Sequence, residues 1–184
     1  MNTVEPIRDI NVINDIMDYL KADNERDYVL FSFGIYSGLR ISDILKLRVR
    51  DIRNKKHIYM REKKTGKERR FIISKELKNI FDSYIKDKKD YEYLFASRKG
   101  LNKPITRQRA YMILKEAGKR FGIESIGTHS LRKTFGYFLY NQTKDILIVK
   151  EVLGHADVSI TRRYIGLTQD DKDRLIKGLS YGRR

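Results

Sequence analysis

Apolar residues recur at helical spacing along most of this chain, and one β-rich stretch between Val49 and Ile73 interrupts that pattern. Within it, the runs HIYMR and RRFII lie on either side of KKTGKE, which predicts a hairpin that turns at Thr65-Gly66. A further strand is predicted beside the hairpin, near Val49–Ile52. We therefore expect an α+β fold that is mostly helical, with one small three-stranded antiparallel sheet.

The helical segments carry start and stop signals. DYVLFSFGIYSGLR is almost continuously apolar, which predicts a buried helix that ends near Gly38, and the short helix ISDILKL follows directly. A long helix should open at Pro104 and Thr106, and a later one should close at Gly154. With 184 residues, no repeat and no low-complexity linker, the chain is expected to form one domain. Other apolar stripes predict helices that begin near Val12 (with Asn11 or Asn14 as cap), Leu77, Leu131, Ile146 and Asp170.

The balance of charge indicates the class of partner. Lys and Arg outnumber Asp and Glu by 40 to 24, and a formal net charge of +16 predicts a polyanionic partner. Nucleic acid is the first choice, with an anionic membrane surface a distant second. No apolar run is long enough to span a membrane, and MNTVEPIRDI is not a signal peptide. These features fit the cytoplasm.

Metal ligands are scarce in the sequence. The chain has no cysteine, which excludes disulfides and any cysteine-bearing zinc site. Only His57, His129 and His155 offer an imidazole, so we expect no dedicated transition-metal site.

Two short segments in the first half suggest anion binding. In GLRISD, Arg40 lies at a helix junction with Asp43 three residues on. An arginine there is usually a surface residue, but the apolar helix before it should bury its surroundings, and Asp43 would then hold the guanidinium rigidly. In KKTGKER, Lys63, Lys64 and Lys67 flank the predicted turn. A lysine-rich turn is most often merely soluble, although hairpin turns also contact DNA phosphates.

Two histidine motifs occupy the second half. In THSLRKTFG, His129 and Arg132 are three residues apart at a helix start and share one face, with Thr128 as a plausible N-cap. A histidine and an arginine so placed are more often ordinary polar surface. The helix N-terminus, however, itself favours anions.

The second motif is LGHADVSITRRYIGL. His155 lies in the turn after the helix-ending glycine, and Asp157 or Ser159 can cap a short helix that follows. Taken singly, this histidine is most simply a capping or packed residue, and a tyrosine among twelve is most simply core or surface packing. The short helix carries Arg162, Arg163 and Tyr164. The conjunction of histidines, arginines and a tyrosine in one basic domain favours a shared site.

In order and spacing, these motifs resemble the catalytic domain of the tyrosine recombinases, the phage integrase family. SGLRISDILKL is similar to the box with the family's first catalytic arginine, KTGKER to its β-hairpin lysine, HSLR to its His-x-x-Arg box, and LGH with a tyrosine nine residues later to its last box. The match covers almost the whole chain. It implies the tyrosine-recombinase catalytic fold and assigns catalytic positions to Arg40, Lys64, His129, Arg132, His155 and Tyr164, with Asp43 in support.

The resemblance also implies a mechanism. The Tyr164 phenol would attack a DNA phosphodiester, forming a 3′-phosphotyrosyl bond without metal, ATP or other cofactor. A free tyrosine phenol has a pKa near 10, so ionising the phenol at neutral pH costs about 4 kcal/mol. Nearby positive groups would reduce that cost. Lys64 fits the general acid, and His129 fits a base or a hydrogen-bond donor to the phosphate. If the hairpin turn lies one residue from its predicted position, Lys63 takes the place of Lys64 as the general acid. Lys63, Lys67, Arg162 and Arg163 would contact DNA.

The implied partners are double-stranded DNA and other recombinase protomers. We expect a free monomer that assembles on paired DNA sites, nucleoid-associated when bound, with the apolar stripe Leu175, Ile176 and Leu179 docking on its own domain or on a neighbour. Residues 1–184 would form the catalytic domain without the N-terminal core-binding domain of the family. The rival hypotheses are a type IB topoisomerase, a non-catalytic DNA-binding accessory protein and an RNA-binding module.

Overall fold

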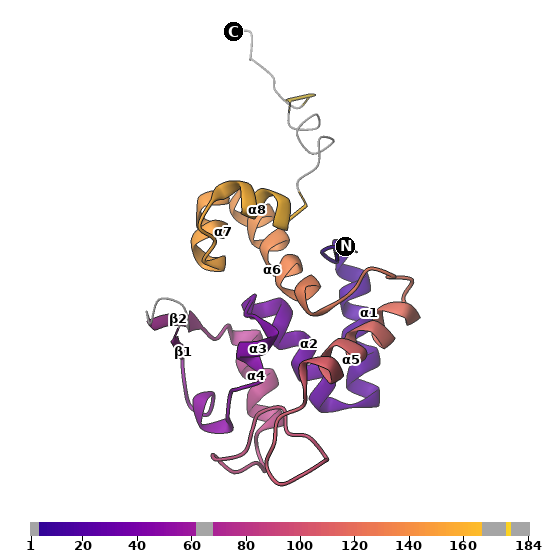
Figure 1. The fold of residues 1–184 in the computed structure, drawn as a ribbon, viewed down its shortest axis with the longest axis vertical. Coiled ribbons are helices and arrows are strands. Elements are labelled where there is room, and N and C mark those ends of the chain that lie inside the picture. The colour runs from indigo at the N-terminus through magenta and orange to yellow at the C-terminus, as the bar shows by residue number, and fades with distance from the viewer. Residues whose placement is uncertain (1–3, 62–67, 167–175, 178–184) are drawn as a thin grey trace.

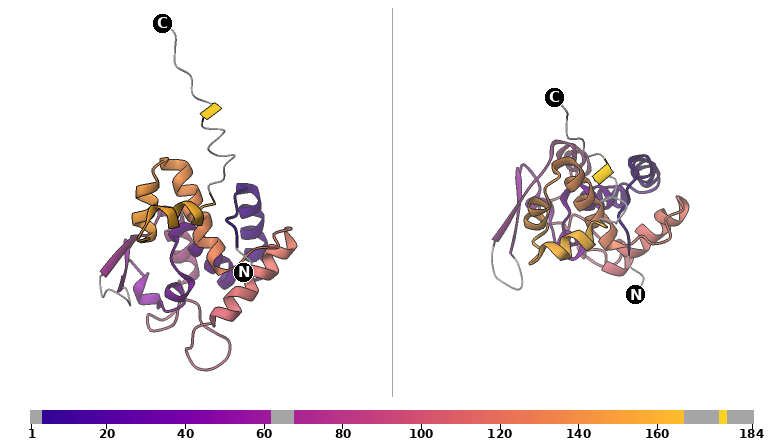
Figure 2. Two further views of the ribbon diagram at one scale, coloured as in Figure 1. Left: turned by 45° about the horizontal axis from the view of Figure 1, so that its top comes forward. Right: turned by 90° about the horizontal axis from the view of Figure 1, so that it is seen from above.

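The computed structural model describes residues 4–61, 68–166 and 176–177. Over these ranges the chain is mostly helical with one small sheet, as predicted (Figures 1 and 2). No described helix is long and apolar enough to cross a membrane. The elements are α1 (Ile10–Asp23), α2 (Glu25–Ser37), α3 (Ile41–Ile44), the 3₁₀ helix η1 (Val49–Asp51), β1 (His57–Arg61), β2 (Glu68–Ile72), α4 (Lys75–Tyr84), α5 (Arg107–Arg120), α6 (Thr128–Thr143), α7 (Ile146–Leu153) and α8 (Val158–Tyr164).

The helix ends predicted at glycines are confirmed. Gly38 follows α2 with φ of 62°, and Gly154 follows α7 with φ of 64°. Both lie in the left-handed region, which only glycine adopts without steric cost. The Thr106 hydroxyl caps α5. Helix α1, in contrast, is capped by the carboxylate of Asp9, which accepts from the Asn11 N–H at 2.8 Å, and not by either predicted asparagine.

The sheet has two described strands, so the predicted third strand is wrong. Strands β1 and β2 pair antiparallel with His57 opposite Ile72, and they lie on the opposite side of the molecule from α1 and α5 in every view (Figures 1 and 2). The predicted turn at Thr65-Gly66 lies outside the described residues.

The stretch near Val49 forms η1 because its backbone donors are bound elsewhere. The Val49 N–H donates to the Glu92 carbonyl at 3.0 Å and the Arg50 N–H to the Asp90 carbonyl at 3.1 Å. The Asp51 carboxylate then accepts from the Arg48 N–H at 2.8 Å and closes the turn. A loop distant in sequence thus takes the place of a neighbouring strand.

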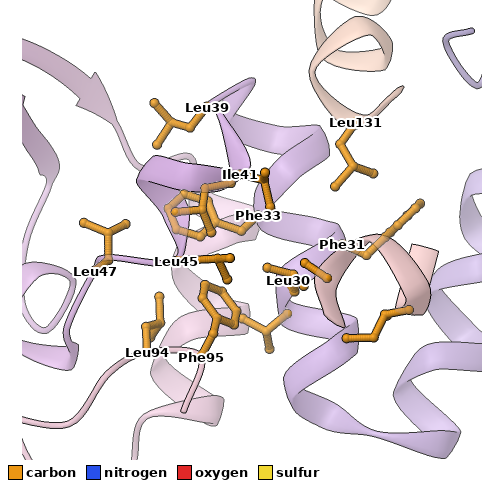
Figure 3. Close-up of a cluster of buried hydrophobic side chains, with 14 of the residues drawn as sticks. Leu30, Phe31, Phe33, Leu39, Ile41, Leu45, Leu47, Leu94, Phe95 and Leu131 are labelled. Carbon is orange, nitrogen blue, oxygen red and sulfur yellow. The ribbon is translucent and has the colours of Figure 1, made fainter. Parts of the chain in front are cut away.

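Helix α2 forms the centre of the main hydrophobic core, as its continuous apolar run predicts. It packs against α1, α4 and α6, and its Leu30, Phe31 and Phe33 are fully buried (Figure 3). The Phe33 ring meets that of Phe81 edge-on, with centroids 4.9 Å apart. Leu131 of α6 lies directly against the backbone of α2, so that this part of α6 is held firmly on the core.

A second, smaller cluster joins α6, α7 and α8. Val149, Leu153 and Ile165 are fully buried there. Aromatic side chains of α6 and Tyr164 of α8 pack around them. Figure 1 shows these helices grouped at one end of the molecule. Helices α7 and α8 are therefore folded back onto α6.

Candidate active site

Arg132 connects the three segments that form the site. Its side chain is almost fully buried, and it donates through Nη1 to the Gly38 carbonyl at 2.5 Å and through Nη2 to the Leu153 carbonyl. These carbonyls lie at the C-terminal ends of α2 and α7, where a helix carries partial negative charge and unpaired acceptors. The guanidinium is therefore fixed in position, and it holds both helix ends against α6.

Tyr164 lies within this arrangement. Its hydroxyl is 3.4 Å from Nδ1 of His129, a long contact, and it is hydrogen-bonded by Arg132. The ring of His155 meets the phenol ring edge-on, with centroids 4.9 Å apart. The structure thus brings His129, Arg132, His155 and Tyr164 together, although Tyr164 lies 35 residues from His129 in the sequence.

Local hydrogen bonds fix the segment that carries His155 and Tyr164. The Asp157 carboxylate caps α8 by accepting from the Ser159 N–H at 2.7 Å, as predicted. Nδ1 of His155 is 3.0 Å from the hydroxyl of Thr161, which is fully buried three residues before the tyrosine. One short helix therefore sets the positions of both rings.

His129 is the second residue of α6. The helix begins at Thr128 with Gly127 as its cap residue, so the predicted cap at Thr128 is one position off. The Ser130 hydroxyl accepts from the Gly127 N–H at 3.1 Å and stabilises this start. His129 is exposed, and Arg132 on the next turn is buried.

Arg40 differs from the prediction in its surroundings. Leu39 and Ile41 on either side are buried, but Arg40 itself is exposed. Its guanidinium forms no ion pair with Asp43, and within the described part of the chain Asp43 pairs with Lys46 at 3.7 Å. Lys46 lies about one helical turn after Asp43, so its ammonium can reach the Asp43 carboxylate. Arg40 instead precedes α3 and has an extended backbone. Arg40 is nevertheless close enough for its charge to act on both His129 and Tyr164.

The charges that act most strongly on His129 are positive. Burial of part of the ring lowers the pKa of His129, and the neighbouring charges of Arg132, Arg107, Arg40 and Lys133 lower it further. The imidazole is therefore neutral at pH 7. Such a concentration of cations favours an anion in their midst.

Burial is the largest influence on Tyr164 and raises the pKa of its phenol. The charge and hydrogen bond of Arg132 and the charge of Arg40 act in the opposite direction, as expected of these arginines, but they do not outweigh burial. The phenol is thus protonated at neutral pH, so a reaction in which its oxygen is the nucleophile would need another group to accept the proton.

The remaining residues predicted to contact DNA or to dock on a neighbouring surface lie only partly within the described ranges. Arg162 and Arg163 are exposed on α8. Lys63, Lys64 and Lys67 lie outside the described residues, as do Leu175 and Leu179, whereas Ile176 is described and 64% exposed. In the described ranges, no group of three or more His, Asp and Glu side chains is placed to hold a metal ion.

Three polar residues of the site were missed in the sequence. Thr161 contacts His155, Lys133 lies 5.4 Å from the centroid of the Tyr164 ring, and the charge of Arg107 acts on His129. Thr161 lies one helical turn before the tyrosine, a spacing that could have indicated it. Lys133 and Arg107 carried no such signal, because their contacts depend on how the helices pack.

Comparison with known proteins agrees with this geometry. The model of the phage integrase family matches residues 8–170. A probable integrase/recombinase of Bacillus subtilis, YoeC, is 51% identical over 170 residues, which cover 92% of this chain and 93% of the relative. Among solved structures, XerA recombinase superposes with a TM-score of 0.78 at 23% identity, over 97% of this chain and 68% of that one.

A second structure, the XerH site-specific recombinase bound to a palindromic difH substrate after cleavage, has a TM-score of 0.71 at 22% identity. The match covers 96% of this chain but only 53% of XerH. The two structures agree with the fold, and the family is established by the sequence matches: this chain belongs to the phage integrase family, the tyrosine recombinases.

Proposed function

We propose that this protein is a site-specific DNA recombinase that cleaves and rejoins strands through Tyr164. The observation that carries the proposal is the position of the Tyr164 hydroxyl, which Arg132 hydrogen-bonds and which lies 3.4 Å from Nδ1 of His129. A nucleophile, a proton acceptor and a cationic anion-binding group thus meet at one point. The net charge of +16 supports DNA as the substrate.

The chemistry is a transesterification. The Tyr164 oxygen attacks the phosphorus, the tyrosine–phosphate bond forms as the bond to the 5′-oxygen breaks, and the phenol proton passes to the neutral His129. Arg40 and Arg132 bind the non-bridging oxygens and stabilise the charge of the transition state. Lys64 protonates the departing 5′-oxygen. The phosphotyrosyl ester retains the energy of the broken bond, so a new 5′-hydroxyl can displace the tyrosine without ATP, metal or other cofactor.

A suicide substrate tests the assignment of the nucleophile. On a nicked duplex whose cleaved end diffuses away, the wild type should accumulate a covalent protein–DNA adduct, and Tyr164→Phe should form none. Tyr140→Phe is the matched control, because that ring packs against the same small cluster. DNA affinity should be equal in all three proteins, since phosphate contacts dominate it. Adduct formation by Tyr164→Phe, for example through Tyr181, would refute the assignment.

The general acid is tested by replacing the bridging 5′-oxygen with sulfur. A thiolate leaves without a proton, so Lys64→Ala should cleave this substrate almost as fast as the wild type while failing on the normal one. If the sulfur substrate restores cleavage by Lys63→Ala instead, the general acid is Lys63. If neither variant is rescued, the hairpin supplies phosphate contacts only.

Strand exchange requires further protomers. We propose that residues 1–184 supply the catalytic domain, that it is a monomer in free solution, and that it assembles on paired DNA sites through residues beyond Leu167. Removal of those residues should preserve DNA binding by the monomer but impair synapsis and recombination. A truncated protein that recombines like the intact one would exclude a role of this segment in trans.

A further inference from the structure

Lys133 is a buried lysine within the site, next to Arg132. Only 7% of its surface is exposed. The whole turn around it, from Ser130 to Thr134, is buried, because α2 covers one side of α6 and the second cluster covers another. An ammonium is rarely this deep in a protein without a partner, since its loss of hydration has to be compensated.

The partner of Lys133 is the nucleophile's ring. Nζ lies 5.4 Å from the centroid of the Tyr164 ring, within the range of a cation–π contact. Lys133 forms no ion pair with any carboxylate in the described part of the chain. Four other lysines in the described ranges also lie over tyrosine rings, but Lys21, Lys115 and Lys144 are exposed and Lys88 is half-buried. Among these lysines, Lys133 is the one whose burial leaves water little access to the contact.

The ring of Tyr164 is therefore held by two different groups. His155 meets it edge-on at 4.9 Å, and Lys133 lies over it from α6. The two groups come from different elements, so together they restrict both rotation of the ring and its distance from α6. The hydroxyl, at the tip of the ring, then stays beside His129 and Arg132.

We propose that Lys133 is a positioning residue of the recombination reaction, which holds the Tyr164 ring through a buried cation–π contact so that its hydroxyl meets the scissile phosphate. This inference rests on the proposed function, since it concerns the same nucleophile. Lys133 acts through Tyr164 and does not itself donate a proton to the substrate.

The test compares Lys133→Met, which keeps the length of the side chain without its charge, with Lys133→Arg, which keeps the charge. Lys144→Met is the matched control, an exposed lysine over a tyrosine on the same helix. The rate of adduct formation on the suicide substrate should fall about 3- to 30-fold in Lys133→Met, the range of a desolvated cation–π contact. Lys133→Arg should restore most of the rate, and DNA affinity should not change. Replacing a buried charge by an apolar side chain is compatible with folding, which thermal unfolding verifies.

The alternatives give different results. A Lys133→Met variant as fast as the wild type, or a Lys133→Arg variant as slow as Lys133→Met, would overturn the proposal. So would weaker DNA binding at an unchanged rate, which indicates a phosphate contact, or rescue of Lys133→Met by the 5′-thio substrate, which indicates a general acid. If the wild type itself forms no adduct, it is the proposed function that fails, and the comparison among the variants does not arise.

Discussion

Arg132 and Arg40 should respond differently to replacement by lysine, although both are assigned to the same phosphate. Arg132→Lys keeps the positive charge, but its single nitrogen cannot take the positions of both Nη1 and Nη2, which donate to the Gly38 and Leu153 carbonyls. A buried carbonyl left without its donor costs about 1–3 kcal/mol of unfolding free energy. For a domain of this size, that corresponds to a fall in Tm of about 2–12 °C. Arg40 is exposed, so Arg40→Lys should change the unfolding free energy by less than about 0.5 kcal/mol.

Both substitutions should slow cleavage on the order of 100-fold, because lysine cannot bind two phosphate oxygens in the geometry of the guanidinium. Thermal unfolding and single-turnover adduct formation, measured on the same samples, separate the two effects. We expect Arg132→Lys to lose stability and rate together, and Arg40→Lys to lose rate alone. Equal stability of the two variants would refute the structural role of Arg132, and near-normal cleavage by both would refute the assignment of the phosphate site.

Further predictions concern the supports of the site. In Gly38→Ala, a Cβ would lie 2.3 Å from Cδ1 of Phe135 at a φ of 62°, so we expect a loss of about 1–3 kcal/mol in urea unfolding; an unchanged midpoint would contradict this. Thr161→Val removes the hydroxyl 3.0 Å from His155 and should slow adduct formation about 2- to 10-fold without weakening DNA binding; an unchanged rate would show that the contact is dispensable. Because the folded-state pKa of His129 is lowered, its contribution to stability is complete above about pH 6.5, the unfolded value, and is lost as the pH falls through the folded pKa. The fall in Tm between pH 7.5 and pH 5 should therefore be smaller in His129→Gln than in the wild type, and an equal fall would exclude this linkage.

Local features of the sequence account for much of the fold. The left-handed glycines after α2 and α7 and the capping residues Thr106 and Asp157 act through neighbouring backbone, so their effects can be predicted without knowing the tertiary structure. The stretch near Val49 could not be predicted in this way. Its β-branched residues suit a strand, but the carbonyls of Asp90 and Glu92 bind its N–H groups and bend it into a 3₁₀ helix.

The same distinction between local sequence and tertiary packing applies to the candidate site. The sequence by itself determined the types and order of the candidate catalytic residues, because the spacing of HSLR and of LGH with its tyrosine is visible in the chain. Only the tertiary structure decided how they meet: Arg132 is buried between two helix ends, Arg40 is exposed and separate from Asp43, and Lys133 lies over the phenol ring. These contacts join α2, α6, α7 and α8. Whether a side chain is buried, and against which partner, depends on the packing of those helices and not on the neighbours of each residue along the chain.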